Sequence, residues 1–351
     1  MWFLRNVDRF SCITGMTLFA LLIMFPLDLE AQNEFRIGEP ETTIRREKPD
    51  LYIPDITSSA TDAVSGVTSG PPAELAPKFQ PGCTYRFRSE LEIQFQFPLR
   101  GTRLANIEHQ SRFDARPRTD GKLGIQLKGR TERLKVEMKA PGESVFYDSF
   151  DAGDRQTPLG MHFNQSLNQW VDLKLNNEHR IVSEDVGGRQ ASTSPLEGFP
   201  QLGTSDLGQT ATVVLQGMPD KPVRPGQSWS VEGVKRLTEV GEIMLNIKCL
   251  YRGEVAHDHN RYLQIDLSGQ ASGDVGLPKQ GSENGKAVLM SLHVPRLSGR
   301  ILYDPLEQMV RLSEQTVSMT VEIPGGPGAS PLIVPVQQKS KIQLLHVIPT
   351  P

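Results

Sequence analysis

The chain has 351 residues, with 38 basic and 41 acidic side chains and a formal net charge of −3. This near balance of charges excludes the strongly basic surface by which nucleic-acid-binding proteins recognise phosphates. Hydrophobic residues make up 37% of the chain, and Gly (31) and Pro (26) are frequent. This composition is more typical of antiparallel β proteins than of helical bundles.

The first segment has the layout of an export signal. Arg5 and Arg9 precede the apolar run Met16–Leu27, which is followed by the small Ala31. A basic start, an apolar stretch of about 7–15 residues and a small residue at the cut describe a secretory signal peptide. The run is shorter than the about 20 residues of a membrane span, and Pro26 interrupts it. We expect residues 1–31 to be cleaved, giving a secreted or periplasmic protein without a transmembrane span.

The next segment, Gln32–Gln80, shows no hydrophobic period. It holds few large apolar residues and many Pro, Gly, Ser and Thr, so it can bury too little surface to offset its chain entropy. We expect a disordered tail or linker that is dispensable for folding, followed by one domain over residues 81–351. A docking peptide at Leu51–Pro54 is the alternative role.

Cys83 and Cys249 are the cysteines that remain after cleavage. In an oxidising compartment an isolated pair is a candidate disulfide. Free cysteines are also among the most buried residue types, so both can instead be small core residues. The sequence leaves these alternatives open, because it does not give the separation of the two Cα atoms.

The sharpest pattern lies between residues 85 and 97. Apolar side chains occupy odd positions and polar or charged ones occupy even positions, with Ser89 breaking the apolar series. This alternation predicts a long strand with one apolar and one wet face. The apolar face either covers a closed core or lines a concave ligand-binding surface. Its residues are the candidate ligand-binding set: Tyr85, Phe87, Leu91, Ile93, Phe95 and Phe97.

Shorter alternating segments follow along the chain and predict further strands, many at spacings of roughly 8–12 residues. A turn at Asp120-Gly121 and a bulge near Gly129 interrupt the first of them, and a loop is expected over Ser272–Lys286. The pattern indicates an antiparallel sandwich, barrel or strongly curved sheet. The predicted strands are 106–116, 123–127, 134–138, 145–147, 171–175, 180–182, 243–251, 262–267, 288–294, 297–303, 309–312, 317–323, 332–336 and 342–348.

Two stretches show helical spacing instead. Apolar residues recur at helical intervals over Leu159–Trp170, behind the helix-starting Pro158, and over Leu207–Leu215, behind a Ser-Asp cap,. We therefore expect a mainly β protein with a few helices.

Four short signatures resemble a family of exported bacterial β-rich proteins. They are Met138–Ser149, Trp170–Val182, Met218–Trp229 and Gly299–Ser313, and the third carries a Pro-x-x-Pro-Val-x-x-Gly-x-x-Trp stretch between two β-rich halves. The family is distantly similar to the half-barrels that carry lipid in lipoprotein localisation. The resemblance implies a curved antiparallel sheet or incomplete barrel with helices at its mouth. It implies no activity, because function resides in sites rather than folds.

Motifs for chemistry are missing from the sequence. It contains no nucleophile elbow, phosphate-binding loop, dinucleotide fingerprint or Cys-x-x-Cys pair, so it predicts no catalytic residue and no cofactor. His257-Asp258-His259 has no identifiable third ligand and is typical of a hairpin turn, so we expect no metal site. Asp148 and Asp304, each at a strand end, are interpreted as turn residues.

Two classes of function stay open. The first is a non-enzymatic envelope protein whose half-barrel binds a lipid, another apolar ligand or a protein partner, with a purely structural envelope component as a variant. The second is a secreted hydrolase whose site is assembled from dispersed residues. The first is favoured by the one-sided strand at residues 85–97,.

Overall fold

The computed structural model describes residues 70–98, 101–157, 160–161, 163, 167, 170–177, 179, 181–187, 214, 218–219, 221–237, 241–278, 287–324 and 330–349. The expected signal peptide, residues 1–31, and residues 32–69 of the expected tail lie outside this range. Among the described residues, no helix combines the length and the apolar character needed to cross a membrane.

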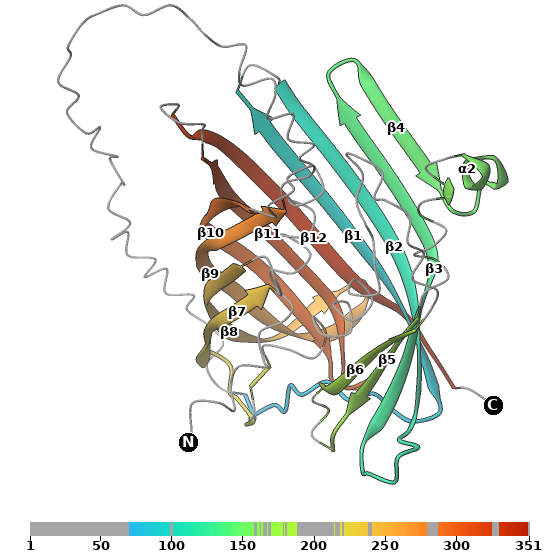
Figure 1. Ribbon diagram of the computed structural model, residues 1–351. Coiled ribbons are helices and arrows are strands. Elements are labelled where there is room, and N and C mark those ends of the chain that lie inside the picture. The colour runs from blue at the N-terminus through green and yellow to red at the C-terminus, as the bar shows by residue number, and fades with distance from the viewer. Residues whose placement is uncertain are drawn as a thin grey trace, which may run out of the picture.

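The described part of the chain is dominated by one antiparallel sheet (Figure 1). Eleven strands form a continuous path in the order β6-β5-β3-β2-β1-β12-β11-β10-β9-β8-β7, and a twelfth, β4, pairs with β3 beside β5. The strands are β1 (Cys83–Phe97), β2 (Gly101–Pro117), β3 (Ile125–Ala140), β4 (Glu143–Asp148), β5 (Trp170–Leu175), β6 (Ile181–Gly187), β7 (Ser228–Leu237), β8 (Gly241–His257), β9 (Asn260–Pro278), β10 (Ala287–Asp304), β11 (Met309–Ile323) and β12 (Leu332–Pro349).

The order of the strands places the two ends of the described chain at the centre of the sheet. β1 pairs with β12, the first half runs outward to β6, and the second half returns inward from β7 at the opposite edge. Figure 1 shows the central strands running the length of the molecule while β7 to β10 curve round at one side. In the described residues β6 and β7 are edges, so the expected curved antiparallel sheet is open and is neither a sandwich nor a closed barrel.

Several strands are longer than the sequence pattern predicts. The segments 288–294 and 297–303 form the single strand β10, and its pairing shifts between His293 and Arg296, on either side of Pro295. A bulge lets a strand continue through a break in alternation. Likewise, β11 and β12 each unite two predicted strands. The loop expected from Ser272 is wrong as far as Pro278, because residues 272–278 pair with β10 and those up to Val275 also pair with β8.

The predicted bulge in the β2–β3 ribbon is present but lies at Glu132 rather than at Gly129. The register shifts between Gln110 and Ser111, which face Arg133 and Thr131. Gly129 has a different role, because a Cβ there would stand 2.5 Å from the Phe113 ring. The absence of a side chain at Gly129 therefore makes room for a buried aromatic ring.

The end of the expected tail, Gly70–Gln80, packs on the sheet, which corrects the predicted domain boundary. Leu75 and Phe79 are fully buried. The Lys78 backbone N–H donates to the Gln308 carbonyl at 2.8 Å, and the Tyr303 hydroxyl donates to the Ala76 carbonyl at 3.1 Å. The sequence pattern missed this segment because Leu75 and Phe79 are isolated apolar residues in a Pro-rich stretch and form no hydrophobic period. Each of them nevertheless buries its whole side chain.

The helices described are few. α2 (Ala152–Gln156) is a short helix that the sequence did not predict, with Asp151 accepting from the N–H groups of Gly153 and Asp154. The helix expected from 159 and the one expected from 207 lie mostly outside the described residues. Trp170, which was expected to end the first of these helices, instead begins β5.

Candidate functional site

The first candidate site is the inner face of the sheet, which we define as the face that carries the odd-numbered side chains of β1. Five of the predicted ligand-binding residues, Tyr85, Phe87, Leu91, Ile93 and Phe95, are at most 5% exposed, and Phe97 is partly buried. They belong to one hydrophobic cluster that extends over the neighbouring strands on both sides. The sequence therefore predicted this strand and its apolar face correctly.

One end of the inner face is closed by aromatic contacts. The Phe79 and Tyr85 rings meet edge to face, with their centroids 4.7 Å apart. The Phe87 and Phe113 rings have the same geometry, with centroids 5.9 Å apart. The Gln80 N–H donates to the Tyr85 hydroxyl at 2.6 Å, and burial raises the pKa of Tyr85 to about 12. The segment Gly70–Gln80 thus covers this end of the sheet.

The opposite end of the inner face is less covered. Phe97 at the end of β1, Met138 near the end of β3 and Leu332 at the start of β12 pack against the core but remain partly exposed. The Arg103 guanidinium lies over the Phe97 ring, 5.3 Å from its centroid. The inner face is therefore closed at one end and more accessible at the other.

A group of polar side chains interrupts the inner face, and the sequence pattern identified only Ser89 as a break. In the sheet Ser89 lies opposite His109 on β2, and Ser111 lies opposite Thr131 on β3. The His109 Nε2 atom is 2.8 Å from the Thr131 hydroxyl. Burial lowers the pKa of His109 to about 4, so the ring is neutral at pH 7.

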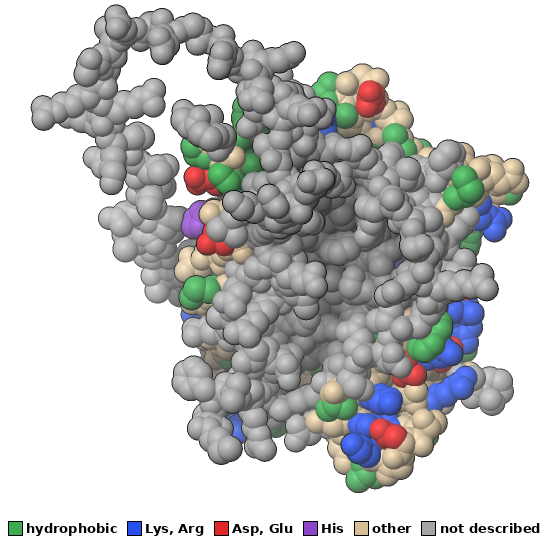
Figure 2. All heavy atoms as spheres, viewed as in Figure 1, with side chains coloured by type: hydrophobic (Ala, Val, Ile, Leu, Met, Phe, Trp, Pro, Cys, Tyr) green, Lys and Arg blue, Asp and Glu red, His purple; other side chains and the backbone are tan. Residues whose placement is uncertain are grey.

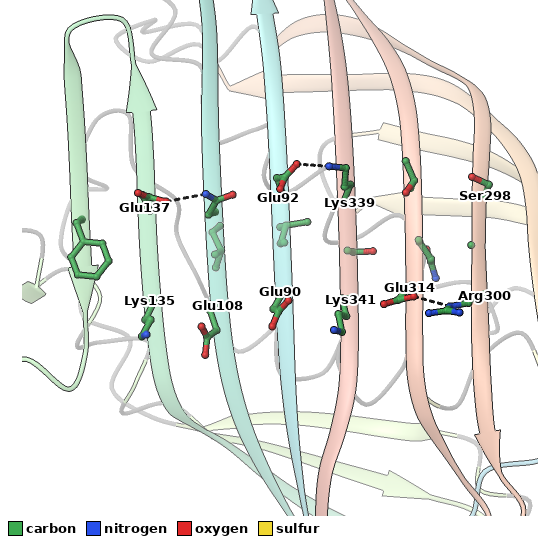
Figure 3. Close-up of a pocket in the computed structure, with 18 residues that line it drawn as sticks. Glu90, Glu92, Glu108, Lys135, Glu137, Ser298, Arg300, Glu314, Lys339 and Lys341 are labelled. Carbon is green, nitrogen blue, oxygen red and sulfur yellow. Dashed lines mark hydrogen bonds and ion pairs between the residues drawn. The ribbon is translucent and has the colours of Figure 1, made fainter. Parts of the chain in front are cut away.

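The second candidate site is an open groove of about 840 Å³ on the outer face, the face that carries the even-numbered side chains of β1 (Figure 3). Figure 3 shows charged side chains in rows across the strands. Lys339 pairs with Glu92 and Arg300 with Glu314, both at 2.8 Å, and Asn106 donates to Glu137 at 3.0 Å.

Charged side chains in this groove form solvent-exposed pairs. Lys139 and Asn106 lower the pKa of Glu137, which is opposite to the shift that makes a carboxyl group a general acid near pH 7. Exposed pairs of this kind contribute little to stability, because water and salt screen them. The paired charges therefore keep the outer face wet, and Glu137 is not poised as a general acid.

Basic side chains also gather at the end of the sheet near the β2–β3 turn and β5 (Figure 2). Arg118 donates to Asp120 through two guanidinium nitrogens, and Asp120 also accepts from the Lys122 N–H. The Lys128 ammonium lies 4.7 Å from the centroid of the Trp170 ring. These local pairs account for the arrangement of the charges in this region.

The other residues considered for chemistry are turn residues. Asp148 and Asp304 accept hydrogen bonds from the N–H groups two residues later, at 3.0 and 2.9 Å. They belong to β4 and β10, with β3, β2, β1, β12 and β11 between them, so they form no carboxylate pair. Asp258 and His259 form the two-residue turn between β8 and β9 with positive φ, as a type I′ turn requires,. No group of three metal-ligating side chains occurs among the residues described.

The candidate disulfide is not formed in the structure. Cys83 lies on β1 and Cys249 on β8, and β12, β11, β10 and β9 stand between these strands. Cys249 belongs to the core, and burial raises the pKa of its thiol to about 12. Cys249 is therefore a core residue without a disulfide, which is the second of the two alternatives left open by the sequence. Cys83 is partly buried against the same core.

Comparison with known proteins gives only remote likenesses. No protein-family model and no curated protein matches the sequence. Lipovitellin, from a study of its lipid–protein interactions, is 14% identical with a TM-score of 0.44, over 78% of this chain and 26% of that chain. DynF of the dynemicin biosynthesis pathway of Micromonospora chersina is 10% identical with a TM-score of 0.23, over 88% and 92% of the two chains.

An outer membrane channel from Pseudomonas putida F1 is 6% identical with a TM-score of 0.16, over 79% of this chain and 100% of that chain. The match to lipovitellin spans about a quarter of that longer chain. At these scores the likenesses assign neither a family nor a function to this protein.

Proposed function

We propose that this protein is exported to the bacterial envelope and acts there without catalysis, by holding an apolar ligand on the inner face of its open sheet. The export part rests on the charged, apolar and small residues of segment 1–31,.

The observation that carries the ligand proposal is the sidedness of the sheet. From β3 across β1 and β12 to β8, the inner face is mostly apolar and its apolar residues belong to one cluster, whereas the outer face carries paired charges. A closed barrel covers such a face with its own far wall, which an open sheet lacks. A lipid or other apolar ligand would cover the face in place of that wall, and the accessible end at Phe97, Met138 and Leu332 gives it a route of entry.

Binding of the apolar fluorophore diphenylhexatriene to the full mature protein tests this proposal. We expect saturable binding, with affinity reduced at least about tenfold in Met138→Trp, because the larger side chain fills the inner face near its accessible end. Phe146→Trp is the matched control, since Phe146 is 61% exposed on the neighbouring strand. Unfolding midpoints verify that both variants fold. A wild-type protein that binds no probe, or a folded Met138→Trp that binds it unchanged, would contradict the proposal.

A further inference from the structure

The inner face carries one feature that a purely apolar ligand does not explain. Ser89 and Ser111 are 2% and 0% exposed, and neither hydroxyl oxygen has a hydrogen-bond partner. A buried polar group without a partner costs free energy, and native structures contain few of them. Two such hydroxyl groups on adjacent strands therefore point to a ligand that satisfies them.

We propose that Ser89 and Ser111, beside His109, bind the uncharged ester group of an acylated lipid whose chains lie along the inner face. This inference rests on the proposed function and specifies the chemical class of the ligand. The serine hydroxyl groups are the donors, and the ester carbonyl oxygen is the acceptor that the free protein lacks.

The register of the sheet brings the polar group together. Ser89 faces His109 directly, and Ser111 is the next residue of β2 on the same face, opposite Phe87. Thr131 lies opposite Ser111 and holds the His109 ring through its hydroxyl. Diagonal neighbours on adjacent strands lie about 7–8 Å apart at most. At that separation, a single carbonyl oxygen between the two serines would accept from both hydroxyl groups.

The surroundings of the polar group divide the inner face into two apolar parts. On one side lie Phe87 and Phe113, and on the other lie Leu91 and Ile107. A ligand with a polar group in its middle and hydrocarbon on both sides matches this sequence of surfaces. An ester within a long acylated molecule has that character, whereas a plain alkane leaves the hydroxyl groups unsatisfied.

The same surroundings favour an uncharged group. Apart from His109 and Thr131, the residues directly beside the serines on the inner face are apolar, and the neutral His109 supplies no positive charge. Burial of a carboxylate without a cation beside it costs much more free energy than burial of a neutral hydrogen-bonded group. Arg103 on β2 is a cation on this face, but it lies six residues away from His109 along the strand. A free fatty acid is therefore a poorer fit to the serines than its ester.

The test compares three probes with the same labelled chain: the decyl ester of a pyrene-labelled decanoic acid, an alkane of matching length and the free acid. The full mature protein is expected to bind the ester about three- to tenfold more tightly than the alkane, the size of one net hydrogen bond. In the double variant Ser89→Ala/Ser111→Ala this preference disappears, while the affinity for the alkane is unchanged.

Stability of the ligand-free protein supplies a second readout. Removal of hydroxyl groups that lack partners is expected to leave the melting midpoint unchanged or to raise it. Ser149→Ala is the matched control, because the Ser149 hydroxyl accepts from the Leu134 N–H at 2.9 Å and its loss lowers the midpoint. A clear loss of stability in the double variant would show that the serines already have partners, and would overturn the inference.

The outcomes separate this inference from the proposed function. Equal binding of ester and alkane by the wild-type protein overturns the ester site and leaves an apolar ligand-binding face. Tightest binding of the free acid overturns the uncharged class. Binding of none of the three probes overturns the proposed function itself.

Discussion

Replacement of Phe79 by alanine is expected to lower the free energy of unfolding by about 3–5 kcal/mol, the usual cost of removing a buried phenylalanine ring. Phe79 is 1% exposed and meets the Tyr85 ring edge to face at 4.7 Å. Leu75→Ala, at a fully buried position in the same segment, is expected to cost about 2–5 kcal/mol. The measurement is the denaturant midpoint of each variant at an unchanged slope.

Leu123→Ala is the control for these variants, because Leu123 is 77% exposed in the β2–β3 turn and its removal is expected to change stability by less than about 0.5 kcal/mol. Wild-type midpoints for both Phe79→Ala and Leu75→Ala would contradict the packing of Gly70–Gln80. The domain would then begin near residue 81, as the sequence pattern alone suggests.

The second large effect is expected at Phe87. Its ring is fully buried and contacts Phe113 at 5.9 Å, so Phe87→Ala is expected to cost about 3–5 kcal/mol. In a double-mutant cycle with Phe113→Ala, we expect a coupling energy of about 0.5–1.5 kcal/mol from the aromatic contact.

Leu91 serves as the comparison on the same strand. In a closed core Leu91→Ala costs about 2–5 kcal/mol, whereas beside a ligand-filled space the loss is smaller in the ligand-free protein. Leu306→Ala, at a 91% exposed position in the β10–β11 turn, is the matched control. Additive effects at Phe87 and Phe113 would show that the two rings do not interact in solution.

The sequence predicts the strands well where one face is buried and the other is wet. The alternation over residues 85–97 identifies β1 and its inner face, because successive side chains of a strand point to opposite faces of the sheet,. The same rule fails at the ends of long strands, where β9 continues through Ser272 and Gly273. There, pairing with strands on both sides holds residues that have no strand preference of their own.

The candidate site itself was only partly predictable. The pattern shows Ser89 as a single break in an apolar series, and a single serine carries no information about its neighbours. His109 and Ser111 come to lie beside Ser89 through the register of β1 against β2, which depends on pairing over the whole strand,. Residues 32–69, for which the sequence predicts a dispensable tail, lie outside the described range.

The central claim is that an apolar ligand lies on the inner face, and native mass spectrometry of the protein purified gently from the organism that makes it tests this most directly. The bound mass is identified after release by lipid extraction. We predict a mature protein that carries a neutral ester lipid, and a folded Met138→Trp variant that has lost most of it. A wild-type protein whose measured mass is that of the polypeptide alone, with no lipid in the extract, would contradict the claim.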